Sequence, residues 1–310
     1  MQRAARAALD LLPQAGRDAR HFFESHFVPH MIEAAGFVTG YYEPEVAASP
    51  VRTERFAVPL YRRPDDLVEI AETERPEGWD ADTRFGRRTE SGTTPYFDRA
   101  AIEEGALAGR ALELAWIADP VDAFFIHVQG SARLRLAGGA TMRIAFDGKS
   151  GHTYTSIGRL AVERGILTRE AADKDGLEAW LKANPQKARS LMRENRSFVF
   201  FRETGQDEAD GPLGAAGVPL TPRRSLAVDR TLHTFHTPIW VDAPKLIAPG
   251  HPGQPFRRLM VAQDTGSAIL GPARGDIFIG SGADAGSIAG RIRHDAAMIA
   301  LVPVGAARAA

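Results

Sequence analysis

The chain has 310 residues, enough for two domains of ordinary size, since domains cluster at about 100–150 residues. Its 38 Lys and Arg residues nearly balance its 39 Asp and Glu residues, so the net charge of −1 gives no general attraction to nucleic acid or anionic membrane. The absence of cysteine excludes disulfides, thiolate catalysis and cysteine-ligated zinc. No apolar stretch reaches the roughly 20 residues that span a bilayer.

The N-terminal third begins helical and then turns to strands. Apolar residues at helical spacing predict a helix across residues 6–35. The β-branched and aromatic run Phe37–Tyr42 predicts a strand that ends at Pro44, and residues 58–61 predict a second strand. Charge, Pro and Gly between residues 69 and 91 predict a long exposed loop.

The central segment reads as a helix followed by a β-rich unit. Asp98 is a plausible N-cap for a helical stretch between residues 95 and 113. Apolar runs predict strands over 124–128 and 132–136, and Gly138-Gly139 predicts a hairpin turn before a further strand at 141–146.

The remainder alternates between helix and strand. Helices are expected after Gly151 and over 175–194, a strand at 198–201, and short strands separated by Pro and Gly after Pro219. The order of predicted elements along the chain, with strands first, a mixed helix and strand segment in the middle and strands again at the end, indicates a mainly β, α+β protein. Its first and last segments could form one barrel around an inserted domain.

Three aspartates near the C-terminal end lie beside glycines: Asp264, Asp276 and Asp284. Glycine permits sharp strand exits and close approach of a ligand. The apolar run Ile277–Ile279 follows Asp276, so its carboxyl group is expected at the start of a partly buried strand, where desolvation raises its pKa above about 3.9. Glycosidic cleavage needs such a protonated carboxyl group for the leaving oxygen.

Other interpretations of these aspartates stay open. Aspartates beside glycines are commonly turn residues. Asp264-Thr265-Gly266 matches the local signature of aspartic proteases, but it occurs once, whereas that chemistry needs two carboxylates that share a proton. The three aspartates could also supply the carboxylate pair of an ordinary glycosidase, whose separation the sequence does not give.

No pattern indicates a metal or a cofactor. His26 and His30 are four residues apart, but the intervening residues lack the glutamate of a metalloprotease helix and include Pro29. The glycines at 280, 282 and 286 have the wrong spacing for a dinucleotide fingerprint. We therefore expect no metal site and no bound cofactor.

Adjacent tyrosines suggest a carbohydrate-binding role. Most aromatic rings belong to cores, but neighbours on a strand point to opposite faces. One ring of the Tyr41-Tyr42 pair can therefore pack inward while the other faces a cleft.

Several segments occur in a fixed order along the chain: Thr39-Gly40-Tyr41-Tyr42-Glu43-Pro44, Phe125-Ile126-His127-Val128-Gln129-Gly130-Ser131, Gly148-Lys149-Ser150-Gly151-His152-Thr153-Tyr154, Ser156-Ile157-Gly158, Asn195-Arg196-Ser197-Phe198-Val199-Phe200-Phe201 and Pro219-Leu220-Thr221. With the aspartate-rich end, they resemble the membrane-bound lytic murein transglycosylase A family and its C-terminal three-aspartate domain. The resemblance runs from about Thr39 to Pro303.

The resemblance implies a double-psi β-barrel built from residues 1–95 and 205–310, with a smaller β-rich domain inserted at 96–204 and a groove for the glycan between them. The family cleaves the β-1,4 bond between N-acetylmuramic acid and N-acetylglucosamine and leaves 1,6-anhydromuramoyl ends. By motif position, Asp276 is the single acid and base, and Asp264 supports it.

The resemblance also implies where substrate and protein meet. Expected substrate contacts are Tyr41, Tyr42, Gln129, Gly130, Ser131 and the more distant Asp284. The partner is peptidoglycan, the enzyme is expected to be a monomer, and its place is the periplasm. Members are usually tethered to the outer membrane through a lipidated N-terminal cysteine, which this chain lacks, so we expect a lost anchor or a soluble periplasmic member. The alternative is a wall protein that binds peptidoglycan without cutting it.

Overall fold

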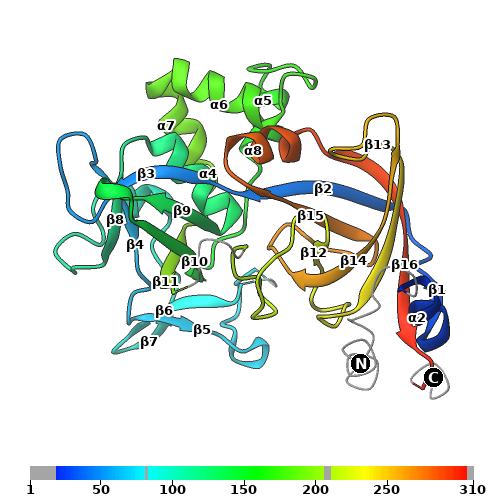
Figure 1. The fold of residues 1–310 in the computed structure, drawn as a ribbon. Coiled ribbons are helices and arrows are strands. Elements are labelled where there is room, and N and C mark those ends of the chain that lie inside the picture. The colour runs from blue at the N-terminus through cyan, green and yellow to red at the C-terminus, as the bar shows by residue number, and fades with distance from the viewer. Residues whose placement is uncertain (1–18, 81–82, 206–210, 306–310) are drawn as a thin grey trace. The chain divides into compact units, whose positions relative to one another are not determined.

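The computed structural model describes residues 19–80, 83–205 and 211–305, and the chain divides into two compact units. The first unit holds the described residues up to Tyr41, Leu213–Gly280 and the described residues from Arg291 onward. The second holds Tyr42–Pro212 and Ser281–Gly290. Strands form most of the first unit, whereas the second unit combines strands with helices (Figure 1), which confirms the prediction of a mainly β, α+β protein.

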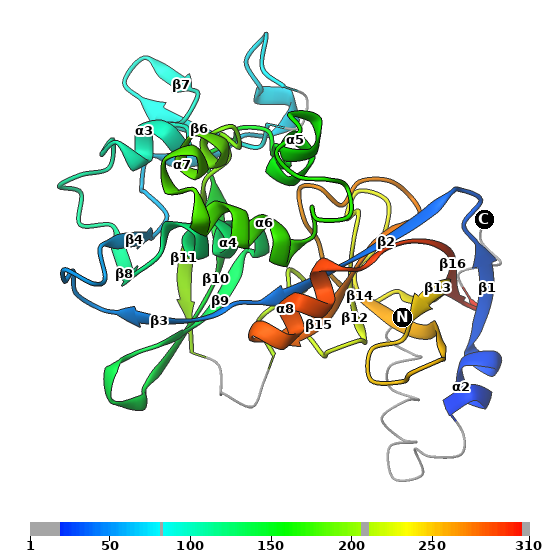
Figure 2. The ribbon, with the colours of Figure 1, turned by 90° about the horizontal axis from the view of Figure 1, so that it is seen from above.

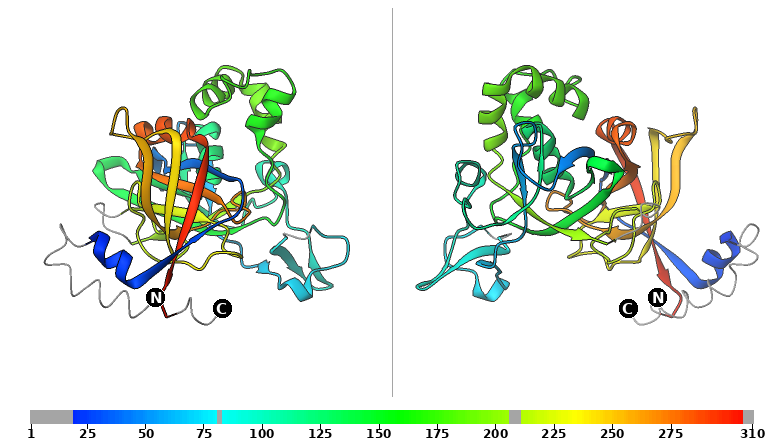
Figure 3. Two further views of the ribbon diagram at one scale, coloured as in Figure 1. Left: turned by 90° about the vertical axis from the view of Figure 1, so that its right-hand side faces the viewer. Right: turned by 60° about the vertical axis from the view of Figure 1, so that its left-hand side comes forward.

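The first unit is a barrel. Its seven-stranded sheet has the order β1 (Phe27–Met31), β16 (Arg293–Pro303), β13 (Pro238–Ile247), β14 (Pro255–Asp264), β12 (Ser225–Val228), β15 (Arg274–Ser281) and β2 (Gly36–Glu43). An additional pairing of β16 with β2 closes the sheet and leaves β1 outside the ring. The left view of Figure 3 shows β14, β13 and β16 side by side. The expected barrel of first and last segments is therefore present.

Alternation explains how the barrel strands fill its interior. On β13 the side chains of Ile239 and Val241 are fully buried, whereas Trp240 between them is exposed. Every residue of the short strand β12 is buried, and the strand pairs on both edges, in parallel with β14 and antiparallel with β15. Continuous apolar runs are typical of strands in such positions.

The second unit contains two further sheets. A six-stranded sheet has the order β11 (Val199–Thr204), β10 (Thr141–Lys149), β9 (Ser131–Arg135), β3 (Glu45–Ser49), β8 (Glu113–Ile117) and β4 (Val58–Tyr61). A three-stranded sheet has the order β5 (Leu67–Glu69), β6 (Phe85–Thr89) and β7 (Gly92–Thr94). Short 3-10 turns lie at Glu72–Glu74 and Ala137–Gly139.

These pairings correct the expected domain boundaries. Residues 42–95, assigned from the sequence to the barrel, lie in the second unit. The strand pairings are one reason, because β3 pairs with both β8 and β9, and β4 pairs with β8. A shared apolar cluster is the other, and it contains the aromatic residues Tyr61, Phe85, Tyr96, Phe198 and Phe200. The expected 69–91 loop is likewise partly β-structure.

Helices cover the six-stranded sheet (Figures 1 and 2). Helix α4 (Pro120–Gln129) packs on the sheet, and α6 (Lys174–Ala183) packs on α4 and on α7 (Pro185–Arg193). Helix α5 (Ile157–Glu163) contacts α7, and α8 (Ala283–Gly290) contacts α6. The short α3 (Arg99–Glu103) begins at Asp98, whose side chain accepts from the Ala101 amide as expected of an N-cap.

Two expected elements were wrong. The predicted strand at 124–128 is part of α4, because Asp119 caps it, Pro120 occupies its first turn and Gly130 ends it in a left-handed conformation. The helix predicted over 6–35 is reduced to α2 (Ala19–His26), followed by β1; residues 6–18 lie outside the described residues. His26 and His30 therefore do not share a helix face.

Most other expected strands and helices are present, including the hairpin of β9 and β10, but the helical stretch expected between 95 and 113 is reduced to α3. After Pro219, four of the strands have 8–11 residues instead of being short, and α8 was not expected. Among the described residues, no helix has the length and apolarity needed to cross a membrane.

Candidate active site

Two of the three singled-out aspartates lie in one row of the barrel. On β12, Ala227 pairs with Asp264 of β14 on one side and with Asp276 of β15 on the other. Residues directly opposite one another in a sheet point to the same face. With strands about 4.8 Å apart, the two aspartate Cα atoms are roughly 10 Å apart across the small side chain of Ala227.

A β-bulge produces this alignment. The pairing of β12 with β14 shifts between Leu226↔Ala262 and Ala227↔Asp264, so Gln263 is an extra residue on β14. Without it, strict alternation would turn the side chain of residue 264 to the opposite face. The bulge therefore brings the Asp264 carboxylate to the face that carries Asp276.

The carboxyl group of Asp276 is held by two residues of the same unit. Thr39 donates its hydroxyl hydrogen to Asp276 Oδ1 at 2.5 Å, and Arg274 Nη2 donates to Thr39 Oγ1 at 2.8 Å. Thr39 lies on β2 and Arg274 begins β15, two residues before Asp276.

Burial dominates the protonation of Asp276. Burial, as the larger cause, and the negative charge of Asp264 together raise the pKa of this carboxyl group from its ordinary value of 3.8 to about 6. The Thr39 hydroxyl and the Arg274 guanidinium oppose this by stabilising the ionised form. A carboxyl group with a pKa near 6 is balanced between donating and accepting a proton in mildly acidic to neutral solution.

Asp264 has a separate set of partners. Its Oδ2 accepts from the Tyr41 hydroxyl at 2.8 Å, and its Oδ1 accepts from the backbone amides of Ala215 and Thr265 at 3.0 and 2.9 Å. Burial raises its pKa, while these three donors lower it. Each aspartate thus has its own donors, unlike the proton-sharing pair of an aspartic protease.

The two adjacent tyrosines point to opposite faces of β2, as the sequence predicts. The ring of Tyr41 lies 5.4 Å from that of Phe278, and burial together with Asp264 raises its pKa well above the ordinary value. Tyr42 is buried in the second unit, with its ring against Gly286 and 5.7 Å from Lys174 Nζ. This burial favours a packing role for Tyr42 over direct contact with a glycan.

The motif residues Gln129, Gly130 and Ser131 form the corner between α4 and β9, in the second unit. Gln129 Oε1 accepts from the Tyr42 amide at 3.0 Å, which fixes the end of β2 within that unit. Gly130 has φ 79°, a left-handed conformation that glycine adopts readily at a helix C-terminus. Substrate contact by these three residues stays a prediction.

Asp284 is not part of the aspartate row. It lies in the first turn of α8, is exposed to solvent, and belongs to the second unit. A negative charge at this position interacts favourably with the helix dipole. Its placement suits helix stabilisation, and its predicted substrate contact is untested.

A buried ion pair in the second unit was not singled out from the sequence. Glu43 is fully buried and lies 2.8 Å from Arg143 Nε, and Ser281 donates its hydroxyl to Glu43 Oε2 at 2.5 Å. The Gly282 amide also donates to the Glu43 carbonyl at 2.9 Å. Glu43 therefore ties the last residue of β2 to the end of β15 and to Gly282 before α8.

Thr39 and Arg274 are the site residues that the sequence reasoning missed. Both could have been found by alternation, since Thr39 lies two residues before Tyr41 and Arg274 two before Asp276, on the same strand faces. The glycine-rich surroundings of the aspartates drew attention away from these neighbours.

Comparison with known proteins gives the family. The model of the MltA specific insert domain matches residues 37–202, and the model of the 3D domain matches residues 224–302. The chain belongs to the MltA family. A crystal structure of a membrane-bound lytic murein transglycosylase from Agrobacterium tumefaciens is 46% identical, with a TM-score of 0.88 over 94% of this chain and 80% of that one.

Two further proteins are similar to this MltA-family chain. Membrane-bound lytic murein transglycosylase A of Vibrio cholerae is 38% identical over 200 residues, which are 63% of this chain and 53% of that protein. A crystal structure of Escherichia coli MltA with bound chitohexaose is 30% identical, with a TM-score of 0.75 over 97% of this chain and 83% of that one. The chain spans between 53% and 62% of the length of the first curated relatives it matches.

Proposed function

We propose that this chain is a peptidoglycan lytic transglycosylase in which Asp276 is the acid and base. The observation that carries the proposal is the row of Asp264, Ala227 and Asp276, with the pKa of Asp276 raised by burial to about 6. The names of the relatives and the oligosaccharide bound by the E. coli relative support a glycan substrate.

The reaction needs one proton to move twice. Protonated Asp276 donates to the glycosidic oxygen as the bond from the muramoyl C1 to that oxygen breaks. The resulting carboxylate then accepts the proton of the C6 hydroxyl as its oxygen bonds to C1, which closes the 1,6-anhydro ring and restores the acid. No water enters, and because the hydroxyl belongs to the same sugar, proximity replaces a separate nucleophile.

The neighbours of Asp276 have supporting roles in this proposal. Thr39 and Arg274 orient its carboxyl group and limit the rise in its pKa. Asp264, held by Tyr41 and two backbone amides, supplies a fixed negative charge on the same face, which would favour the positive charge that develops on the sugar ring.

The alternative is a protein that binds glycan without cutting it. Binding alone gains nothing from a carboxyl group whose ionisation is disfavoured by burial, because that arrangement costs stability. The site therefore favours the enzyme. By the family resemblance, we also propose a periplasmic place and peptidoglycan strands as the partner.

The test compares products released from purified peptidoglycan by the wild type, Asp276→Asn and Asp295→Asn. Asp295 is an exposed aspartate of β16, so its variant matches the charge change away from the aspartate row. Muropeptides lighter by one water than lysozyme products, lost in Asp276→Asn and kept in Asp295→Asn, are expected. Ordinary reducing ends would instead show hydrolysis, and pelleting with peptidoglycan without release would support the binding protein.

A further inference from the structure

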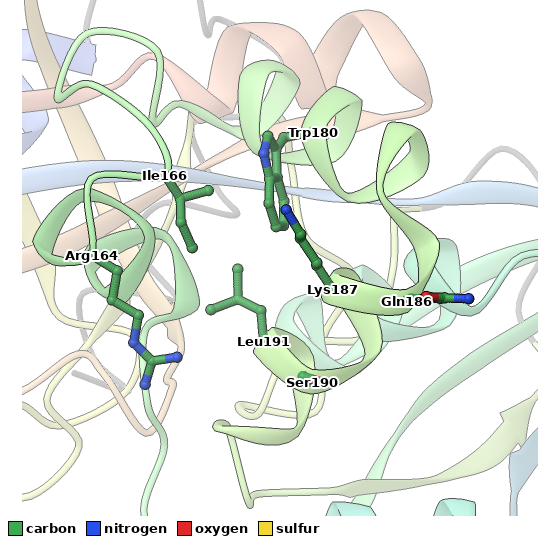
Figure 4. A pocket seen from close by; sticks show the side chains of 7 residues that line it. All are labelled: Arg164, Ile166, Trp180, Gln186, Lys187, Ser190 and Leu191. Carbon is green, nitrogen blue, oxygen red and sulfur yellow. The ribbon is translucent and has the colours of Figure 1, made fainter.

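The second unit has an open cavity that contains none of the residues discussed for the active site. It has a volume of about 470 Å³ and opens among the end of α5, α6 and α7 (Figure 4). Its lining includes Ile166, Trp180 and Leu191, the cations Arg164 and Lys187, and Ser190. Its volume falls within the roughly 300–1,000 Å³ of ordinary ligand pockets.

Part of the lining of this cavity is apolar. Leu191 is buried in the cluster that joins α4, α5, α6 and α7, and Ile166 and Trp180 pack against that cluster while staying partly exposed. Figure 4 shows Ile166, Leu191 and the Trp180 ring directed toward a common space. An indole face that remains open to solvent can cover an aliphatic group of a ligand.

The charges at the cavity are positive. Other cations of these helices have acidic partners, with Lys174 at 2.6 Å from Glu178 and Lys182 at 2.8 Å from Asp122. Among the described residues, by contrast, no acid forms an ion pair with Lys187, and none lines the cavity. Arg164 has one such partner, Glu194, through a single Nη2 contact at 2.8 Å. The cavity is therefore complementary to an anion.

We propose that this cavity binds a short peptide that has small aliphatic side chains and ends in a free carboxylate. The carboxylate would pair with Lys187, the side chains would cover Trp180, and the Ser190 hydroxyl could donate to a peptide carbonyl. This inference rests on the proposed function, because the glycan strands of peptidoglycan carry short peptides with free carboxylates. It adds a peptide-recognition site in the second unit to the proposed glycan cleavage.

Calorimetric titration of the full chain with acetyl-alanyl-alanine and with its C-terminal amide tests the proposal. We expect the acid to bind at least tenfold more tightly than the amide. Lys187→Glu and Trp180→Ala should each weaken binding of the acid at least tenfold. Arg189→Glu is the matched control, because Arg189 is an exposed cation of α7 that does not line the cavity, and it should leave binding unchanged.

Failure of this site and failure of the proposed function are distinguishable. Asp276→Asn should bind the dipeptide like the wild type, so binding does not depend on cleavage. Equal affinity for acid and amide, equal losses in Lys187→Glu and Arg189→Glu, or saturation by decanoate but not by the dipeptide would overturn the peptide proposal. In all these cases the cleavage assay would still report on Asp276 separately.

Discussion

Asp276→Asn should stabilise the folded protein in neutral solution while it removes the proposed acid. Raising the pKa of Asp276 from 3.8 to about 6 means that ionisation is disfavoured in the folded state by about 3 kcal/mol, since one pKa unit corresponds to about 1.4 kcal/mol. Asparagine has nearly the same shape and no charge to desolvate. The loss of the charged acceptor for Thr39 offsets part of the gain, so about 3 kcal/mol is an upper bound.

The direction in which the free energy of unfolding changes with pH follows from the linkage between folding and proton binding. The folded state binds this proton more tightly than the unfolded state, so the contribution of Asp276 to stability falls as pH rises from about 4 to about 6. Below about 4 both states hold the proton, and the carboxyl group and the asparagine amide are equally neutral. The difference in stability between Asp276→Asn and wild type should therefore be small at pH 4 and reach its maximum above pH 7.

Urea unfolding, monitored by circular dichroism at a series of pH values from 4 to 8, measures this difference in the free energy of unfolding. Asp295→Asn serves as the control, because it removes an exposed charge from the same unit. A difference that stays constant over the whole range would refute the reasoning. So would an Asp276→Asn variant less stable than wild type at pH 8, since either result would mean that burial does not disfavour the ionised carboxylate.

Three other changes have expected outcomes. Arg274→Met should raise the pKa of Asp276 further, because it removes a stabilising cation, and the alkaline limb of the pH–rate profile should move to higher pH. Arg143→Met should cost up to about 3–5 kcal/mol in urea unfolding, because buried Glu43 would keep only the more distant cation Arg133, whose Nη2 lies 4.0 Å from Glu43 Oε2. Gly286→Ala should loosen α8 in hydrogen exchange, because the added Cβ would lie 2.8 Å from an aromatic ring carbon.

Each of these three predictions would be contradicted by a specific result. An alkaline limb that stays in place or moves to lower pH in Arg274→Met would show that the cation does not act on Asp276. Stability of Arg143→Met within about 0.5 kcal/mol of wild type, as for ordinary surface substitutions, would show that the buried pair is not required. Unchanged exchange of the α8 amides would mean that the neighbouring ring yields at little cost.

Much of the fold could be predicted because local signals and tertiary structure agree. The alternating and aromatic pattern before Pro44 is β2, and the glycine pair at 138–139 lies at the β9–β10 hairpin. The prediction failed at residues 124–128, where a largely buried helix shows the same continuous apolar run as a buried strand. There the deciding signals were Asp119, Pro120 and Gly130 at its ends.

The candidate site was predictable in part. The apolar run after Asp276 predicted a partly buried carboxyl group with a raised pKa, as the structure has it, whereas its role as the acid came from the family resemblance. The row with Asp264 was not predictable, because it depends on a pairing of both strands with β12, which is separated from them in the sequence. The Glu43–Arg143 pair joins residues 100 positions apart, and no local pattern reports such a contact.

The bulge at Gln263 and the central position of β12 also bear on how the loop between the two aspartates can evolve. Each carboxylate is placed by its own register with Ala227, so the nine residues from Thr265 to Ala273 do not set their separation. Insertions and deletions in that loop should be tolerated among relatives, provided the loop still closes. Removal of one residue from β14 itself would rotate Asp264 away from Asp276, so length variation should be confined to the loop and absent from the strand.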